Sequence, residues 1–190
     1  MDNLRERKKT LTRDAIEGRA LELFLKRGYD RVRVEDICAD ALVSPRTFFR
    51  YYASKEDLVL GRLRAHLMQA ERLFDTRPAG EPLRDSLQAV ITRVAEDYGT
   101  EPERELARLR LVTTTPALEV GLLNVFSGFE RLVRAFVAAQ LELSPDARHA
   151  RLLGAAVVAA FRVGLEVWID ENAASDLPTL VMTNVDELVP

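Results

Sequence analysis

Apolar residues recur along most of this chain at spacings of three and four, which is the pattern of helices that bury one face. No segment shows the alternation of apolar and polar residues between turn signals that indicates a strand. The pattern therefore predicts an all-α fold. Helices are expected over residues 12–27, 34–41, 45–52, 54–76, 82–98, 102–114, 117–142, 146–172 and 177–188.

The first third of the chain contains clear signals for helix ends. Gly28 follows the first amphipathic segment, and a glycine just past the last periodic residue ends a helix. Ser44 followed by Pro45 combines an N-cap residue with a proline at the first helical position. The helix after it is short, and Phe48 and Tyr52 form its inner face. Two short helices joined by a tight turn and supported by a longer helix are typical of a helix-turn-helix.

The same region resembles a known family. The shared residues run from Thr12 to Leu60 in the expected order and include Gly28-Tyr29, Val34-Glu35-Asp36-Ile37, the segment Val43-Ser44-Pro45-Arg46-Thr47-Phe48-Phe49-Arg50-Tyr51-Tyr52 and Ser54-Lys55-Glu56-Asp57-Leu58. This stretch is similar to the TetR (tetracycline repressor) family of bacterial transcriptional regulators. The resemblance implies a DNA-binding domain over residues 1–55 and a helical domain over 56–190 that binds an effector and dimerises.

The resemblance also implies roles for particular residues. Arg46 and Arg50 lie one helical turn apart and away from the inner face, so both can reach a major groove, where arginine can bond guanine bidentately. Lys55 corresponds to the family's phosphate anchor at the start of a helix. The expected DNA-binding residues are Arg33, Ser44, Pro45, Arg46, Thr47, Phe49, Arg50, Tyr51 and Lys55.

Three positions depart from the family's pattern. Many relatives have tyrosine where this chain has Phe49, and a phenyl ring cannot donate to a phosphate, so packing on a sugar or a thymine methyl is expected instead. Arg33 replaces a threonine that caps the next helix, but its guanidinium can reach a phosphate directly. Leu42 replaces a glycine in the turn, where a bulky residue at positive φ is disfavoured.

The second half of the chain predicts a dimer. Residues 152–169 are apolar almost all round, and one face can be buried within the chain while the rest needs a partner. The family forms a four-helix bundle between two subunits with its last two long helices, which here implies a homodimer through residues 146–188. A twofold dimer also fits a pseudo-palindromic DNA operator.

A ligand pocket is expected among the inward faces of the helical domain. The candidates are Leu67, Phe74, Leu87, Ile91, Val94, Tyr98, Leu109, Phe126, Phe129, Phe161 and Trp168. Their apolar character favours a small hydrophobic or amphipathic effector, such as an acyl chain or an aromatic metabolite. A further alternative is a DNA-binding dimer without ligand, whose pocket is filled by Phe126, Phe129, Phe136 and similar side chains.

Charge changes the picture modestly. The net charge is −3, but residues 1–60 carry +2 and the remainder −5, and all four lysines (Lys8, Lys9, Lys26 and Lys55) lie in the first part. Basic residues at positions 5–9 are either a charged tail or an arm that contacts DNA. The charged start has no apolar segment behind it and the longest apolar run, residues 152–161, is too short for a bilayer, so we expect a cytoplasmic protein without a membrane segment.

Catalytic and metal chemistry have little support. One cysteine and two histidines cannot form the usual zinc sites, and no glycine-rich phosphate loop or nucleophile elbow is present. We therefore expect no cofactor and no enzyme activity. The combined prediction is a ligand-responsive regulator, most simply a repressor. The alternative from another class is a helical-bundle enzyme or carrier that does not bind DNA.

Overall fold

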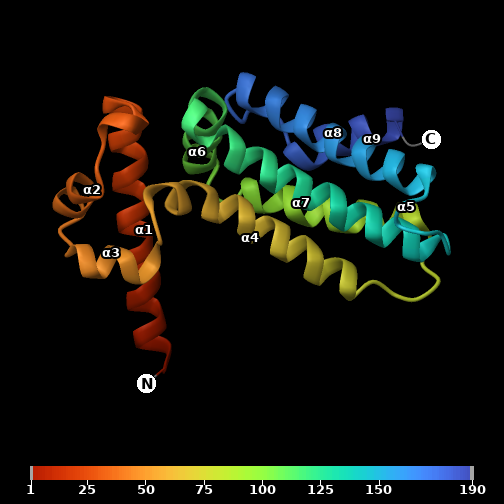
Figure 1. The fold of residues 1–190 in the computed structure, drawn as a ribbon, viewed down its shortest axis with the longest axis horizontal. Helices are drawn as coiled ribbons and strands as arrows, with labels where there is room; N and C mark the ends of the chain where they lie inside the picture. Colours follow the sequence, from red (N-terminus) through yellow and green to blue (C-terminus); the bar gives the residue numbers. More distant parts are fainter. Residues whose placement is uncertain (1, 189–190) are drawn as a thin grey trace. The chain divides into compact units, whose positions relative to one another are not determined.

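The computed structural model describes residues 2–188, with side chains from residue 6 onward. The described part is all-helical without strands, which confirms the predicted fold class. Figure 1 shows the helices α1 (Asp2–Arg27), α2 (Val34–Asp40), α3 (Pro45–Tyr51), α4 (Lys55–Asp75), α5 (Leu83–Tyr98), α6 (Pro102–Thr114), α7 (Pro116–Gln140), α8 (Arg148–Asp170) and α9 (Leu177–Leu188), and the 3-10 turn η1 (Tyr29–Arg31).

The predicted helix bounds agree with these elements to within two residues, with one exception. Helix α1 begins at Asp2 instead of residue 12. The added turns are charged and exposed where side chains are described, so they carry no apolar periodicity. Arginine, glutamate and lysine are nevertheless good helix formers, and Lys9 lies 3.7 Å from Glu6 one turn earlier. Hydrophobic periodicity detects burial, and these turns are helical without being buried.

The chain divides into two compact units. The first comprises the residues up to Arg62 together with Ala107–Val120, and the second comprises Leu63–Leu106 and the residues from Gly121 onward. Helices α4, α6 and α7 therefore each contribute one part to each unit. The expected domain boundary at residue 55 remains a prediction, since a division by contacts is a different criterion from a functional boundary.

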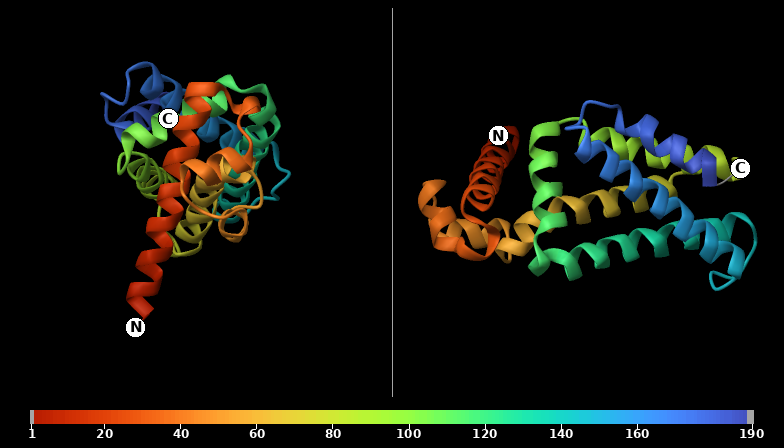
Figure 2. Two further views of the ribbon diagram at one scale, coloured as in Figure 1. Left: turned by 90° about the vertical axis from the view of Figure 1, so that its left-hand side faces the viewer. Right: turned by 90° about the horizontal axis from the view of Figure 1, so that it is seen from above.

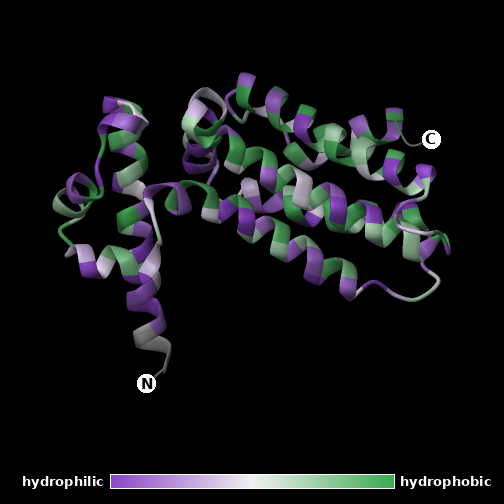
Figure 3. Ribbon diagram, viewed as in Figure 1, coloured by the Kyte–Doolittle hydropathy of each residue, from purple (hydrophilic) through white to green (hydrophobic). Residues whose placement is uncertain are grey.

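The first unit is built around the inner face of α1. Ile16, Ala20 and Phe24 are almost fully buried, as the periodicity predicted, and Ile37 of α2 and Phe48 of α3 share that core. The first turns of α1 extend beyond α3 within this unit (Figures 1 and 2), and the coloured turn that follows the grey start is mostly hydrophilic in Figure 3. The core thus fixes α2 and α3, while residues 6–11 of α1 are exposed.

In the second unit, α8 and α9 pack side by side over much of their length, and α5 also contacts α9. A Cβ at Gly164 of α8 would lie 2.6 Å from Cγ2 of Val181 in α9, so only glycine allows this approach. The side chain of Asn184 donates to the carbonyl of Ala160 at 3.0 Å. These contacts fix α9 against one side of α8.

The other side of α8 is apolar and has no partner among the described residues 6–188. Leu152 and Val163 are 56% and 40% exposed, respectively. The helix is long and apolar enough to cross a membrane by length and composition, and a third of its most apolar window is buried. The core helix of a soluble protein can have the same length and apolar composition, so these two properties are weak evidence for a membrane segment. The exposed apolar side of α8 is a candidate surface for assembly with another chain.

Candidate nucleic-acid interface

Helix α3 is anchored at both ends by its own sequence. The Ser44 hydroxyl accepts from the backbone N–H of Thr47 at 3.1 Å, and Pro45 occupies the first helical turn, as the sequence predicted. Phe48 is fully buried, and Tyr52, which ends the helix, is 4% exposed. The inner face is therefore fixed by packing, and the helix presents its remaining side chains outward.

The two predicted arginines lie on that outward side. Arg46 and Arg50 are both exposed. The Arg50 guanidinium stacks 4.9 Å from the Tyr51 ring centroid, with Nη2 3.3 Å from its hydroxyl. Within residues 6–188, Arg46 has no hydrogen bond or ion pair, so its guanidinium is available for a base edge. Phe49 is 56% exposed, a large apolar surface on the same short helix.

The turn before α3 carries two of the unusual residues. Leu42 has φ 54° and is 92% exposed, so the chain holds a leucine in the left-handed region without any packing in return. The backbone N–H of Arg33 donates to the Asp36 carboxylate at 2.8 Å, which caps the start of α2. The capping function expected from the family's threonine is thus supplied by Asp36, and the Arg33 side chain is exposed and available for DNA.

Lys55 has a structural role that sequence reasoning missed. Its Nζ donates to the carbonyl oxygens of Tyr29 at 2.8 Å and Val32 at 3.2 Å, and it lies 4.1 Å from the Tyr29 ring centroid. An ammonium has three N–H groups, so one remains for a phosphate. Lys55 as a phosphate anchor therefore remains a prediction, combined with a role in fastening α4 to η1.

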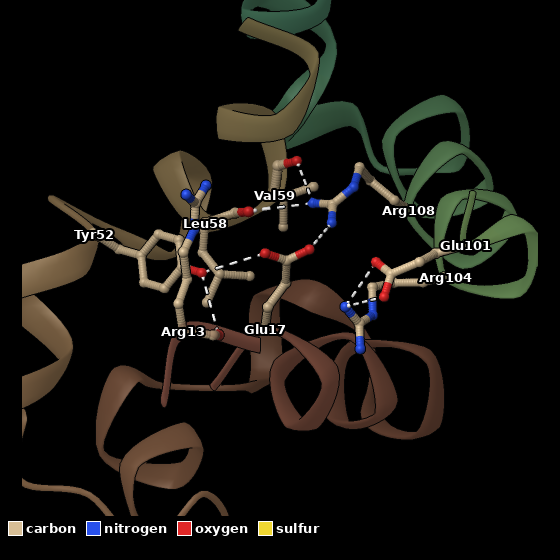
Figure 4. Close-up of polar contacts among 8 residues, drawn as sticks. All are labelled: Arg13, Glu17, Tyr52, Leu58, Val59, Glu101, Arg104 and Arg108. Carbon is tan, nitrogen blue, oxygen red and sulfur yellow. Dashed lines mark hydrogen bonds and ion pairs between the residues drawn. The ribbon is translucent and has the colours of Figure 1, made fainter. Parts of the chain in front are cut away.

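A buried polar junction lies in the same unit and was not predicted. Arg108 of α6 is fully buried and its guanidinium pairs with the carboxylate of Glu17 in α1, which in turn lies 3.3 Å from the Tyr52 hydroxyl (Figure 4). Burial, followed by the nearby Glu17 charge, raises the pKa of Tyr52, so its hydroxyl stays protonated as a donor. The one signal in the sequence was helical spacing, because Arg108 lies three and four residues before the apolar Leu111 and Val112.

The predicted pocket residues are divided between the units. Leu109 belongs to the first, and the other candidates belong to the second. Of the latter, Phe74, Leu87, Ile91, Val94, Tyr98 and Trp168 are buried, whereas Leu67, Phe126, Phe129 and Phe161 are partly exposed. A ligand pocket among these residues remains a prediction.

Two further features of the second unit were not predicted. His66 of α4 is 1% exposed and its ring lies 4.3 Å from that of Tyr98, which places a polar ring among the candidate pocket residues. An open hollow lies along the exposed side of α5 and includes Arg77, Glu81 and Arg93 but none of the predicted pocket residues. Among the described residues, no group of three or more histidine, cysteine or acidic side chains could hold a metal ion.

Comparison with known proteins agrees with this architecture. Residues 18–61 match the family described as bacterial regulatory proteins, tetR family, and residues 81–190 match the MftR C-terminal domain. The HTH-type transcriptional regulator TcmR of Streptomyces glaucescens is 38% identical over 185 residues, which cover 93% of this chain and 81% of TcmR. The chain belongs to the TetR family.

Solved structures show that the fold extends over more than nine-tenths of the chain. The structure of the SmeT–triclosan complex matches with a TM-score of 0.70 at 18% identity, covering 94% of this chain and 90% of SmeT. FadR of Thermus thermophilus in complex with lauroyl-CoA matches with a TM-score of 0.59 at 23% identity, covering 93% of each chain. This TetR-family protein is a helix-turn-helix transcriptional regulator and not an enzyme, which sets the enzyme or carrier alternative aside.

Proposed function

We propose that the chain acts as a homodimeric repressor in the cytoplasm, which binds a pseudo-palindromic operator through α3 and releases it when a hydrophobic or amphipathic molecule binds the second unit. The observation that carries the DNA-binding part is the geometry of α3. Its inner face is fixed by Phe48 and Tyr52, while Arg46 and Arg50 are exposed four residues apart. This arrangement presents two guanidinium groups to one groove.

The dimer is supported by the outer side of α8. Leu152 and Val163 remain exposed after α9 has packed against the helix, and a soluble chain buries such a surface in an assembly. A second copy is the simplest partner, because a twofold interface pairs the same surface from each subunit. Two α3 helices related by that axis would read two half-sites of a pseudo-palindrome.

The effector class is supported by composition and by relatives. The candidate pocket residues of the second unit are almost all aliphatic or aromatic, with the Tyr98 hydroxyl and the neighbouring His66 ring as polar groups. The SmeT structure contains triclosan and the FadR structure contains lauroyl-CoA, both of which carry large apolar groups. An apolar molecule with one polar end would match this combination.

The test begins with selection of DNA from a random pool, followed by analytical ultracentrifugation of the protein on the selected duplex. The expected result is an enriched motif with dyad symmetry that binds two protomers. Triclosan and lauroyl-CoA then serve as first probes in a thermal-shift assay and in an operator-binding assay. Enrichment of no motif, or binding of a single protomer to an asymmetric motif, would overturn the proposal.

A further inference from the structure

One guanidinium in the first unit holds parts of three helices together. From α6, Arg108 donates through Nη1 to the carbonyl oxygens of Val59 at 2.9 Å and Leu58 at 3.3 Å, both in the first turns of α4, and through Nη2 to Glu17 of α1 (Figure 4). The planar fork of arginine suits such a site, because its donors point in fixed directions. The position of Arg108 thus depends on α4 and α6 together.

The carboxylate of Glu17 faces two ways. Oε1 accepts from Arg108, and Oε2 lies 3.3 Å from the hydroxyl of Tyr52. That hydroxyl is also 3.4 Å from the carbonyl oxygen of Arg13, one turn earlier in α1. Tyr52 is the residue at which α3 ends, and its own N–H donates to the carbonyl of Phe48. A continuous polar path therefore leads from α6 through α1 to the end of the helix that presents Arg46.

A path of this kind is costly if stability is its only purpose. Both Arg108 and Glu17 are buried, and replacing a buried ion pair by apolar residues of similar volume is often neutral or stabilising. What polar groups add is a defined geometry. Arg108 belongs to α6 and binds α4, and both of these helices, like α7, have one part in each unit. Arg108 therefore contacts or belongs to two helices that have a part in the second unit.

We propose that Glu17 couples α4 and α6 to operator reading. Arg108 fixes the Glu17 carboxylate, and Glu17 fixes the end of α3 through the Tyr52 hydroxyl. Displacement of α6 or of the first turns of α4 moves Arg108 off Glu17, frees Tyr52 and loosens the orientation of α3. This inference rests on the proposed function and adds to it the route by which the second unit controls DNA binding.

The test is a double-mutant cycle on operator affinity between Arg108→Met and Tyr52→Phe. Tyr52→Phe removes only the hydroxyl and keeps the aromatic ring, whose centroid lies 5.6 Å from that of Phe48. A lost hydrogen bond to a charged group corresponds to roughly tenfold or more in affinity. We expect each variant to weaken operator binding by about this factor, and the double variant to bind no worse than Arg108→Met alone. Affinity for scrambled DNA should stay unchanged throughout.

The matched control is Arg104→Met, one turn earlier on α6. Arg104 pairs with Glu101 at 2.9 Å and takes no part in the path to Tyr52, so its effect should multiply with that of Tyr52→Phe. If Arg108→Met shows no cooperative unfolding, Arg108→Lys replaces it, because lysine keeps the charge but lacks the planar fork that fixes the geometry between Glu17 and the two carbonyls. Thermal unfolding of every variant separates lost stability from lost coupling.

The possible outcomes distinguish failure of the proposed function from failure of the proposed coupling. A wild-type protein that selects no operator overturns the proposed function itself. A wild type that binds its operator while Arg108→Met and Tyr52→Phe have multiplicative effects overturns only the coupling. The coupling is equally overturned if operator and scrambled DNA weaken in the same proportion, or if Arg104→Met is as non-additive as Arg108→Met.

Discussion

The ammonium of Lys55 lies 2.8 Å from the carbonyl oxygen of Tyr29 and 4.1 Å from the centroid of the same residue's ring. The first residue of α4 is thereby fastened to η1, the turn that follows α1. A cation over an aromatic face and a charge-assisted hydrogen bond reinforce each other here. The proposed phosphate contact would use the remaining N–H of the same side chain.

Replacing Lys55 by alanine should therefore lower both stability and DNA affinity. We expect the free energy of unfolding to fall by about 1–3 kcal/mol, because two carbonyls lose a charged donor. Loss of one phosphate contact per subunit should flatten the slope of log K against log[salt] by about 0.9 per contact, on operator and scrambled DNA alike. Urea unfolding and a salt titration measure the two effects.

The matched control is Lys26→Ala, whose side chain is 73% exposed and forms only a surface ion pair with Glu22. The free energy of unfolding of this variant should differ from that of the wild type by less than about 0.5 kcal/mol. A Lys55→Ala protein with the wild-type salt slope would show that the residue fastens α4 without touching a phosphate.

Arg46→Ala should behave differently from Lys55→Ala. A base-reading arginine contributes about 1–3 kcal/mol of discrimination, so operator affinity should fall by roughly tenfold to a hundredfold while scrambled DNA binds nearly as before. Relaxed specificity is expected at one symmetric base-pair position. Fluorescence anisotropy on operator and scrambled duplexes measures this, with the exposed Arg72→Ala of α4 as control. Equal losses on both duplexes would argue against base reading.

Charges placed on the outer side of α8 should separate the dimer. The double variant Leu152→Glu/Val163→Glu introduces two carboxylates at positions that are exposed in the protomer, so the fold itself should tolerate them. Sedimentation velocity is expected to show a dimer for the wild type and a monomer for the variant. Val120→Glu, at a site 70% exposed on α7, should remain dimeric. A wild-type monomer at micromolar concentration would contradict the interface.

Leu42→Gly should stabilise the protein. At φ 54° a leucine costs about 1–2 kcal/mol that glycine does not, and at 92% exposure it loses no packing when shortened. Leu25→Gly provides the contrast, because Leu25 is also exposed but lies within α1, where glycine costs about 1 kcal/mol. Thermal unfolding should therefore give shifts of opposite sign for the same substitution. Shifts of the same sign would show that the turn is unstrained.

Stability should decline at high pH through Tyr29. Burial, with Glu56 and Asp30 nearby, raises its pKa to about 12, whereas an unfolded tyrosine ionises near pH 10. The folded state keeps a proton that the unfolded state releases. The stabilisation is thus complete below pH 10 and is lost as pH rises toward 12, by at most about 1.4 kcal/mol per pH unit. Urea unfolding at pH 9 and 11 measures this loss in the wild type and in Tyr29→Phe. If both proteins lose the same unfolding free energy between the two pH values, Tyr29 is not the cause.

The sequence predicted elements that depend on burial and local signals. Ser44-Pro45 marked the start of α3, and the spacing of Ile16, Ala20 and Phe24 marked the buried face of α1. It did not predict the first ten residues of α1 as helix, because their helicity comes from residue preference and charge pairs without any apolar pattern. Local information was sufficient where the determinant was local.

The candidate site was predicted only in part for the same reason. Arg46 and Arg50 lie on one short helix, so their exposure follows from helical spacing alone. Arg108 and Glu17 are 91 residues apart, and nothing near either one specifies the other. The role of Lys55 was missed because its acceptors are backbone carbonyls 23 and 26 residues away, which any residue could supply.

The distribution of lysines makes the protein convenient for chemical footprinting. Lys8, Lys9, Lys26 and Lys55 are the only lysines, and all belong to the first unit. An amine-reactive reagent read by mass spectrometry therefore modifies side chains in that unit alone, whatever molecule occupies the second. Lys55, with two of its protons held by carbonyls, should react more slowly than the exposed Lys26. A faster reaction of Lys55 would therefore report that its hydrogen bonds to Tyr29 and Val32 have been lost.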